Sequence, residues 1–138
     1  MADSVERLDP KTKSTPALRP VIGIVDDDAS VLRALKRLLG ASGFTVETYG
    51  SAEEYLALGH PERVDCLLLD IHLGGLSGFE LRERLIEARV TTPVIFITAV
   101  DDAPTRERAR RAGAVEYLLK PLDERVLLEA IQEALDSA

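Results

Sequence analysis

Polar side chains able to bind a metal or a phosphoryl group come directly after four short apolar segments of this 138-residue chain. In chain order they are Asp26, Asp27 and Asp28 after residues 21–25, Asp70 after 66–69, Thr98 after 94–97 and Lys120 after 115–119. If these segments are parallel strands of one open sheet, their carboxyl ends share the edge at which such folds bind ligands. The sequence therefore predicts one site that combines carboxylates, a hydroxyl and an ammonium, a set suited to a divalent cation and a phosphoryl group.

Asp26, Asp27 and Asp70 are the carboxylates expected to crowd together at the ends of two strands. Crowded carboxylates repel one another unless a cation shields them, and an all-oxygen set selects a hard ion such as Mg²⁺. Asp28 has a simpler explanation, because it can cap a following helix. No helix pattern begins directly after Asp70, so capping does not account for that residue.

Lys120 and Thr98 are ambiguous by themselves. The ammonium of Lys120 could pair with a carboxylate and later with a phosphoryl oxygen, or it could be an ordinary solvated lysine. Thr98 could act through its hydroxyl, or it could simply be a β-branched residue that suits a strand. Their positions after apolar segments favour the functional interpretation only in combination with the acidic residues.

Apolar runs alternate with helical patterns from Val21 onward, which predicts an α/β domain with a doubly wound, five-stranded parallel sheet and helices on both faces. The expected strands cover residues 21–25, 44–48, 64–69, 94–97 and 115–119. Expected inner faces include Phe79, Leu81, Leu85 and Ile86 in the third helix, and Val126, Leu127, Ala130, Ile131 and Leu135 in the fifth. Residues 1–20 are polar and proline-containing and are expected to form a flexible extension before a domain over 21–138.

Composition narrows the classes of function. The formal net charge is −7, which argues against nucleic acid as a direct partner because phosphate backbones require a basic surface. The single cysteine, Cys66, lies in an apolar run and is expected to be a small core residue. No signal peptide or membrane-spanning run is visible, so a cytoplasmic protein without membrane contact is expected.

The chain resembles the receiver domain of two-component response regulators over residues 21–138. The matching segments are Ile24-Val25-Asp26-Asp27-Asp28, Leu67-Leu68-Leu69-Asp70, Ser77-Gly78-Phe79-Glu80-Leu81, Pro93-Val94-Ile95-Phe96-Ile97-Thr98-Ala99, and Ala112-Gly113-Ala114 with Lys120-Pro121. Each segment is weak alone, but together, in this order and spacing, they are specific. The resemblance implies a flavodoxin-like fold with strand order 2-1-3-4-5.

The resemblance also implies roles for individual residues. Asp70 matches the phosphoacceptor, and Asp26 and Asp27 match the acidic pair that, with Asp70, binds Mg²⁺. The backbone carbonyl of His72 stands where the family supplies a further metal ligand. Thr98 matches the switch hydroxyl, Lys120 the phosphate-pairing lysine and Tyr117 the switch aromatic residue.

Partners follow from the same resemblance. A sensor histidine kinase or a histidine phosphotransfer protein is the expected phosphoryl donor, and the chain is expected to catalyse only its own phosphorylation and dephosphorylation. A downstream protein, or a second copy of the chain, is expected to bind the surface formed by the fourth helix, fifth strand and fifth helix. With no DNA-binding module recognisable, we expect a stand-alone receiver.

Two features depart from the family pattern. Leu73-Gly74 replaces the usual Met-Pro after the acceptor, which predicts a more mobile loop. His72 stands two residues after Asp70, at a position whose side chain tunes hydrolysis in the family. It could interact with the phosphoryl group, or it could be an exposed loop histidine.

Two other functions fit parts of the sequence. Asp26-Asp27-Asp28 also matches the Asp-x-Asp nucleophile motif of haloacid-dehalogenase-type phosphatases, but Lys120 comes too late in the chain and Asp70 is left unexplained. A receiver fold that binds partners without phosphorylation is the other alternative. Four arginines of the fourth helix (106, 108, 110 and 111) could form a docking surface for a partner or a solvated face.

Overall fold

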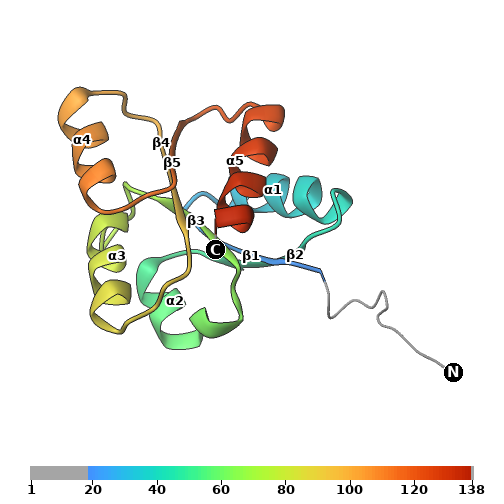
Figure 1. Ribbon diagram of the computed structural model, residues 1–138, viewed down its shortest axis with the longest axis horizontal. Coiled ribbons are helices and arrows are strands. Elements are labelled where there is room, and N and C mark those ends of the chain that lie inside the picture. The colour runs from blue at the N-terminus through green and yellow to red at the C-terminus, as the bar shows by residue number, and fades with distance from the viewer. Residues whose placement is uncertain (1–18, 138) are drawn as a thin grey trace, which may run out of the picture.

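Five parallel strands and five α-helices alternate along the chain in the computed structural model, which describes residues 19–137 (Figure 1). The elements are β1 (Val21–Val25), α1 (Ala29–Ala41), β2 (Thr45–Tyr49), α2 (Ala52–Leu58), a 3₁₀ turn (Pro61–Arg63), β3 (Cys66–Asp70), α3 (Gly78–Glu87), β4 (Val94–Thr98), α4 (Ala103–Arg111), β5 (Glu116–Leu119) and α5 (Glu124–Ser137). The predicted extension over residues 1–20 lies outside the described residues, apart from its last two.

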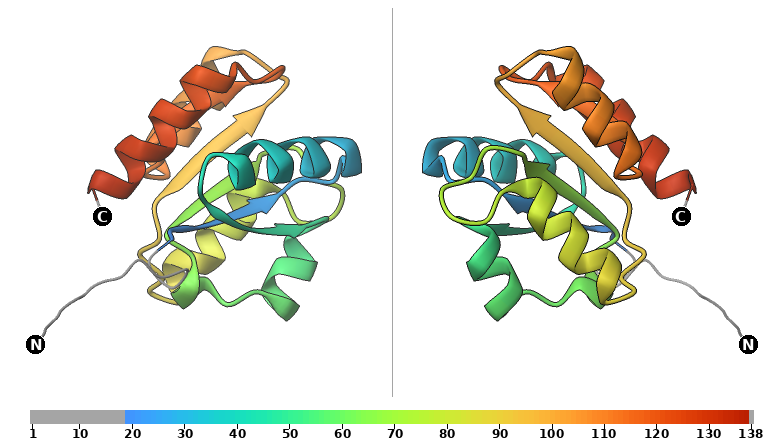
Figure 2. Two further views of the ribbon diagram at one scale, coloured as in Figure 1. Left: turned by 90° about the vertical axis from the view of Figure 1, so that its right-hand side faces the viewer. Right: turned by 90° about the vertical axis from the view of Figure 1, so that its left-hand side faces the viewer.

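The sheet order is β2-β1-β3-β4-β5, with every neighbouring pair parallel. This confirms the doubly wound fold and the strand order 2-1-3-4-5. Helices α1 and α5 cover one face of the sheet, and α2, α3 and α4 cover the other (Figures 1 and 2).

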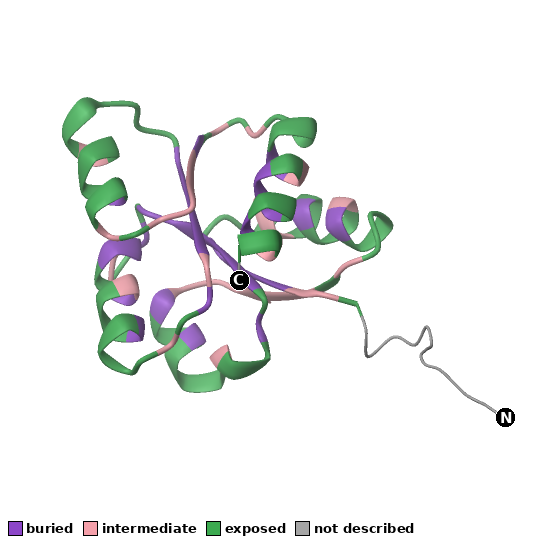
Figure 3. Ribbon diagram, viewed as in Figure 1, coloured by how far each residue is buried: buried purple, intermediate pink, exposed green. Residues whose placement is uncertain are grey.

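Strand side chains alternate between two cores, one on each face of the sheet. The residues of β3 and β4 are buried throughout (Figure 3), as expected for strands covered on both faces. On β3, Cys66 and Leu68 face the core under α1 and α5, whereas Leu67 and Leu69 face the core under α2, α3 and α4. Cys66 is fully buried and burial raises the pKa of its thiol to about 12, which confirms its role as a core residue.

Side chains directly before the helices cap their first turns, as predicted for Asp28. The carboxylate of Asp28 accepts hydrogen bonds from the amides of Ser30 and Val31 and so caps α1. Ser51, Asp102 and Asp123 cap α2, α4 and α5 in the same way. These caps satisfy amides that would otherwise lack partners at the start of each helix.

Two predicted core residues are exposed. The side chain of Ile86 in α3 is 50% exposed and that of Val126 in α5 is 45% exposed. On α5 the buried residues are Leu127, Ala130, Ile131 and Ala134, which follow the spacing of a single helical face. Val126 is one residue, or about 100°, away from that face, and Ile86 is displaced from Leu85 in the same way.

The strand boundaries also differ by one or two residues from those predicted, as in β2, which begins at Thr45.

The first residue of α3, Gly78, packs directly against the backbone at the end of β3. Its amide donates to the carbonyl of Ile71 at 2.9 Å. A Cβ atom at Gly78 would lie 2.3 Å from the carbonyl oxygen of Asp70 and 2.9 Å from the Cα of Ile71. Neither contact is possible without moving the chain. The absence of a side chain at Gly78 therefore allows α3 to begin this close to the Asp70 backbone.

Gly78→Ala is therefore expected to lower the free energy of unfolding by about 1–3 kcal/mol, the usual cost of overpacking, although alanine is the better helix former. Gly74→Ala is the matched control, because a Cβ there meets nothing within 4 Å. The control should be neutral or stabilising by up to about 1 kcal/mol. Urea unfolding followed by circular dichroism measures both, and equal midpoints for the two variants would contradict this account.

Candidate functional site

The register of the sheet brings Asp26, Asp70 and Lys120 together. Val25 of β1 lies opposite Leu69 of β3, so Asp26 and Asp70 follow at matching positions on adjacent strands. Ile24 and Leu68 lie two residues before Asp26 and Asp70, so they are on the same face of their strands, and both face the core under α1 and α5. The pleat therefore turns both carboxylates toward the same side of the sheet. Lys120, two residues after Leu118 of the same core, reaches them from β5.

Lys120 bridges the two carboxylates. Its Nζ lies 2.8 Å from Oδ2 of Asp26 and 3.1 Å from Oδ2 of Asp70. Asp26 is fully buried and Asp70 is 4% exposed. The other oxygens are also used, since Oδ1 of Asp26 accepts from the Asp28 amide at 2.9 Å and Oδ1 of Asp70 accepts from the His72 amide at 3.1 Å.

Burial and repulsion dominate the electrostatics of Asp70. Burial, and next the negative charge of Asp26, raise the pKa of Asp70, and the ammonium of Lys120 and the amide of His72 only partly oppose this. Burial alone would lower the pKa of Lys120, but its close interactions with the carboxylates of Asp26 and Asp70 outweigh burial and raise it. The ammonium is thus held in its charged form between two acids.

A third carboxylate completes the group, because oxygens of Asp26, Asp27 and Asp70 lie within 4.8 Å of one another. Asp27 is exposed, so the group opens to solvent on that side. Oδ2 of Asp26 is buried and, among the described residues, it forms a 2.8 Å ion pair with Nζ of Lys120 but has no hydrogen-bond partner. An all-oxygen set with an incompletely satisfied buried oxygen fits a hard divalent cation such as Mg²⁺.

Thr98 lies at the same edge of the sheet, fully buried. Its Oγ1 accepts a hydrogen bond from the amide of Val100 at 3.1 Å and lies 3.0 Å from Nδ1 of His72. The hydroxyl of Tyr117 donates to the carbonyl of Val100 at 2.8 Å. The contact between His72 and Thr98 was not foreseen from the sequence, because it depends on the path of the loop after β3 and no local pattern encodes that path.

The loop between β3 and α3 is anchored at two points. The side chain of Leu73 is buried, and the amide of Leu76 donates to the carboxylate of Glu53 in α2 at 2.8 Å. Gly75 adopts a φ of +88°, a conformation that glycine accommodates without strain. Gly75 thus allows the turn, and the buried side chain of Leu73 and the hydrogen bond from Leu76 to Glu53 hold the loop in place. The role predicted for the carbonyl of His72 stays a prediction.

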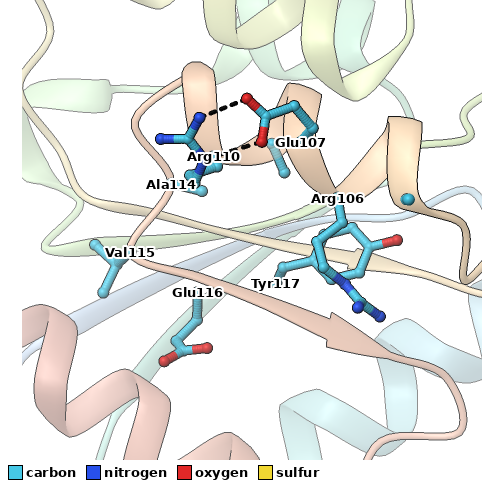
Figure 4. Close-up of a pocket in the computed structure, with 9 residues that line it drawn as sticks. Arg106, Glu107, Arg110, Ala114, Val115, Glu116 and Tyr117 are labelled. Atoms are coloured by element: carbon cyan, nitrogen blue, oxygen red, sulfur yellow. Dashed lines mark hydrogen bonds and ion pairs between the residues drawn. The ribbon is translucent and has the colours of Figure 1, made fainter.

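Helix α4 and strand β5 enclose a shallow groove of about 510 Å³, whose lining includes Arg106, Arg110 and Tyr117 (Figure 4). Arg106 pairs with Asp101 and lies 5.6 Å from the centre of the Tyr117 ring. Arg110 pairs with Glu107 (Figure 4). Intrahelical and local acids therefore offset part of the positive charge of α4.

The strand order together with an acidic group and a lysine at the carboxyl edge of the sheet defines a flavodoxin-like domain of the receiver type. The family model of the response regulator receiver domain matches residues 22–132. The chain belongs to the response regulator receiver domain family, the phosphoacceptor domain of two-component signalling.

Individual relatives agree with this assignment. Nodulation protein W of Bradyrhizobium diazoefficiens is 37% identical over 118 residues, which cover 86% of this chain and 52% of that protein. The structure of response regulator StyR is similar with a TM-score of 0.80 at 44% identity, covering 86% of this chain and 60% of that one. A CheY-like receiver domain protein from Methanospirillum hungatei is similar with a TM-score of 0.79 at 35% identity, covering 86% and 95%.

The chain spans about half the length of the curated relatives it matches. Receiver domains are signalling proteins, and no enzyme family is indicated.

Among residues 19–137, no helix is both long enough and apolar enough to cross a membrane.

The raised pKa of Asp70 predicts a pH-dependent gain in stability on removing its charge. Because the folded protein holds this proton more tightly than the unfolded chain, ionised Asp70 costs stability as the pH rises from about 3.8, the ordinary value, through the raised pKa. Asp70→Asn should therefore raise the thermal midpoint at neutral pH, with the gain vanishing below pH 3.8.

Thermal unfolding measured from pH 3.5 to 7.5 tests this. The matched control is Asp136→Asn, at an exposed position near the end of α5; because the asparagine carbonyl can still accept the hydrogen bond from Gln132, the midpoint should change far less and without this pH dependence. A lower midpoint for Asp70→Asn at neutral pH would show that the ion pair with Lys120 outweighs burial and repulsion.

Proposed function

We propose that Asp70 is the phosphoacceptor of this receiver domain. The observation that carries the proposal is the position of its carboxylate, which lies at the strand end beside the acid Asp26, with the ammonium of Lys120 bridging the two. The proposed donor is the phosphohistidine of a sensor histidine kinase or of a histidine phosphotransfer protein. Attack by an Asp70 oxygen forms the P–O bond as the P–N bond breaks, and the electron pair stays with the departing imidazole.

Mg²⁺ is the proposed cofactor, held by the carboxylates of Asp26, Asp27 and Asp70 and by the backbone carbonyl of His72. When bound, it neutralises charge on the transferring phosphoryl oxygens and on the crowded acids. Lys120 contributes the second positive charge. As Asp70 becomes an acyl phosphate, the ammonium can move from its carboxylate oxygen to a phosphoryl oxygen, where the transferred charge resides.

Thr98 and Tyr117 are the proposed switch. A phosphoryl group on Asp70 adds negative charge and acceptor oxygens at the sheet edge. The Thr98 hydroxyl then moves to donate to one of these oxygens, which vacates space into which Tyr117 turns. In the resting structure Tyr117 is instead hydrogen-bonded to Val100, so the turn exchanges that contact and repacks the surface of α4, β5 and α5.

The surface of α4, β5 and α5 is the proposed site for a downstream partner or a second copy of the chain. The groove beside Tyr117 and the arginines of α4 provide both apolar and charged contacts there. A cytoplasmic location is proposed because the phosphoryl donors named above act there.

Phosphorylation at one acid is tested by incubating the full chain with acetyl phosphate and Mg²⁺ and mapping the modified residue by mass spectrometry. Label is expected on Asp70 and should be lost in Asp70→Asn. Asp136→Asn should be labelled like the wild type. Chelation of Mg²⁺ should also abolish labelling of the wild type.

Two outcomes would favour the alternatives. Label that survives Asp70→Asn but not Asp26→Asn would indicate the haloacid-dehalogenase-type chemistry. No label, and no change of the NMR spectrum with beryllofluoride and Mg²⁺, would indicate a receiver fold that signals without phosphate.

Thr98→Ala tests the switch. The variant should still be labelled at Asp70, because its hydroxyl is not an attacking group, but it should lose most of the spectral change that accompanies phosphorylation of the wild type. Two-dimensional NMR with beryllofluoride measures the change at Tyr117 and along α4. A full wild-type response in Thr98→Ala would show that the hydroxyl does not couple the two sites.

A further inference from the structure

The side chain of His72 contacts the hydroxyl that the proposed switch must move. Its Nδ1 lies 3.0 Å from Oγ1 of Thr98, at the distance of a hydrogen bond. Thr98 is fully buried, whereas His72 is exposed. The imidazole therefore lies over the buried hydroxyl at the sheet edge, and this contact, unlike one between surface groups, is partly shielded from water.

Oγ1 of Thr98 has two hydrogen-bond contacts among the described residues, the amide of Val100 and Nδ1 of His72. Oγ1 already accepts from the amide of Val100 at 3.1 Å. A hydroxyl carries one proton, and the neutral imidazole offers one acceptor nitrogen. Nδ1 is the acceptor that these contacts offer to the hydroxyl proton, so with Nδ1 unprotonated the Thr98 hydroxyl donates to His72.

Phosphoryl oxygens can only accept hydrogen bonds from Thr98. The hydroxyl cannot give its single proton both to Nδ1 of His72 and to a phosphoryl oxygen on Asp70. We propose that His72 is a positioning residue that holds the Thr98 hydroxyl in the resting receiver, so that phosphorylation of Asp70 must displace the imidazole to recruit Thr98. This inference rests on the proposed function and adds a regulatory element to it.

The contact extends beyond Thr98. His72, Thr98, Val100 and Tyr117 form a continuous series, because the amide of Val100 donates to Thr98 and its carbonyl accepts from Tyr117. The imidazole thus stabilises the resting position of the segment between β4 and α4 as well as the hydroxyl. Removing it should shift the protein toward the activated arrangement before any phosphoryl group arrives.

The choice of substitutions separates hydrogen bonding from bulk. Asparagine places its terminal amide near the position of Nδ1, and glutamine places its amide near that of Nε2. His72→Asn can therefore keep a bond to Thr98, and His72→Gln cannot keep it without moving. His60→Gln, at the chain's other histidine, which is exposed and pairs with Glu62, is the matched control.

The experiment is a titration of the full-length, ¹⁵N-labelled chain with beryllofluoride in excess Mg²⁺, followed by NMR. His72→Gln is expected to reach half-saturation at a concentration roughly two- to tenfold lower than the wild type, the range for loss of one neutral hydrogen bond. Its resting resonances of Val100 and Tyr117 should lie part of the way toward their bound positions. His72→Asn and His60→Gln should match the wild type in both measurements.

Equal resting spectra and equal half-saturation for His72→Gln and the wild type would overturn the inference while leaving the proposed function intact. Identical behaviour of His72→Asn and His72→Gln would overturn it too, because the effect would then come from ring bulk alone. A wild type that responds neither to beryllofluoride nor to acetyl phosphate would overturn the proposed function and this inference together.

Discussion

The repulsion between two buried carboxylates at the ends of adjacent strands is the constraint on which the rest of this site depends. Asp26 and Asp70 repel each other where water cannot screen them, and the folded chain places Lys120 between them. One ammonium cannot neutralise both acids together with Asp27, and the pKa of Asp70 stays raised through burial and the charge of Asp26. Such a site costs stability, and it is suited to gaining a divalent cation.

The pleat of the sheet separates the acidic group from the residues proposed to respond to it. Asp26 and Asp70 continue the strand positions that face α1 and α5, whereas Thr98 and Tyr117 continue those that face α2, α3 and α4. A charge added to Asp70 is therefore on one side of the sheet and the groove beside Tyr117 is on the other. The hydrogen bonds through His72, Thr98 and Val100 connect the two sides over the edge.

Close backbone packing fixes the geometry of this edge. Gly78 lets α3 begin against the carbonyl of Asp70, and Glu53 ties the preceding loop to α2. The replacement of Met-Pro by Leu73-Gly74 does not leave the loop without contacts, because Leu73 is buried. Asp70 is thus held by neighbours on both sides, which limits the orientations of its carboxylate.

The sequence by itself determined the fold class, the helix caps and the set of polar residues at the strand ends, because alternating apolar runs and capping side chains are local signals. The sequence predicted the buried faces of the helices less accurately. Ile86 and Val126 belong to apolar stretches but lie just off the buried side of their helices. Only the tertiary structure decided the bridging position of Lys120, the close approach of Gly78 to Asp70 and the contact of His72 with Thr98. Each of these joins residues from different elements, and its distance depends on strand register and loop path, which no local pattern specifies.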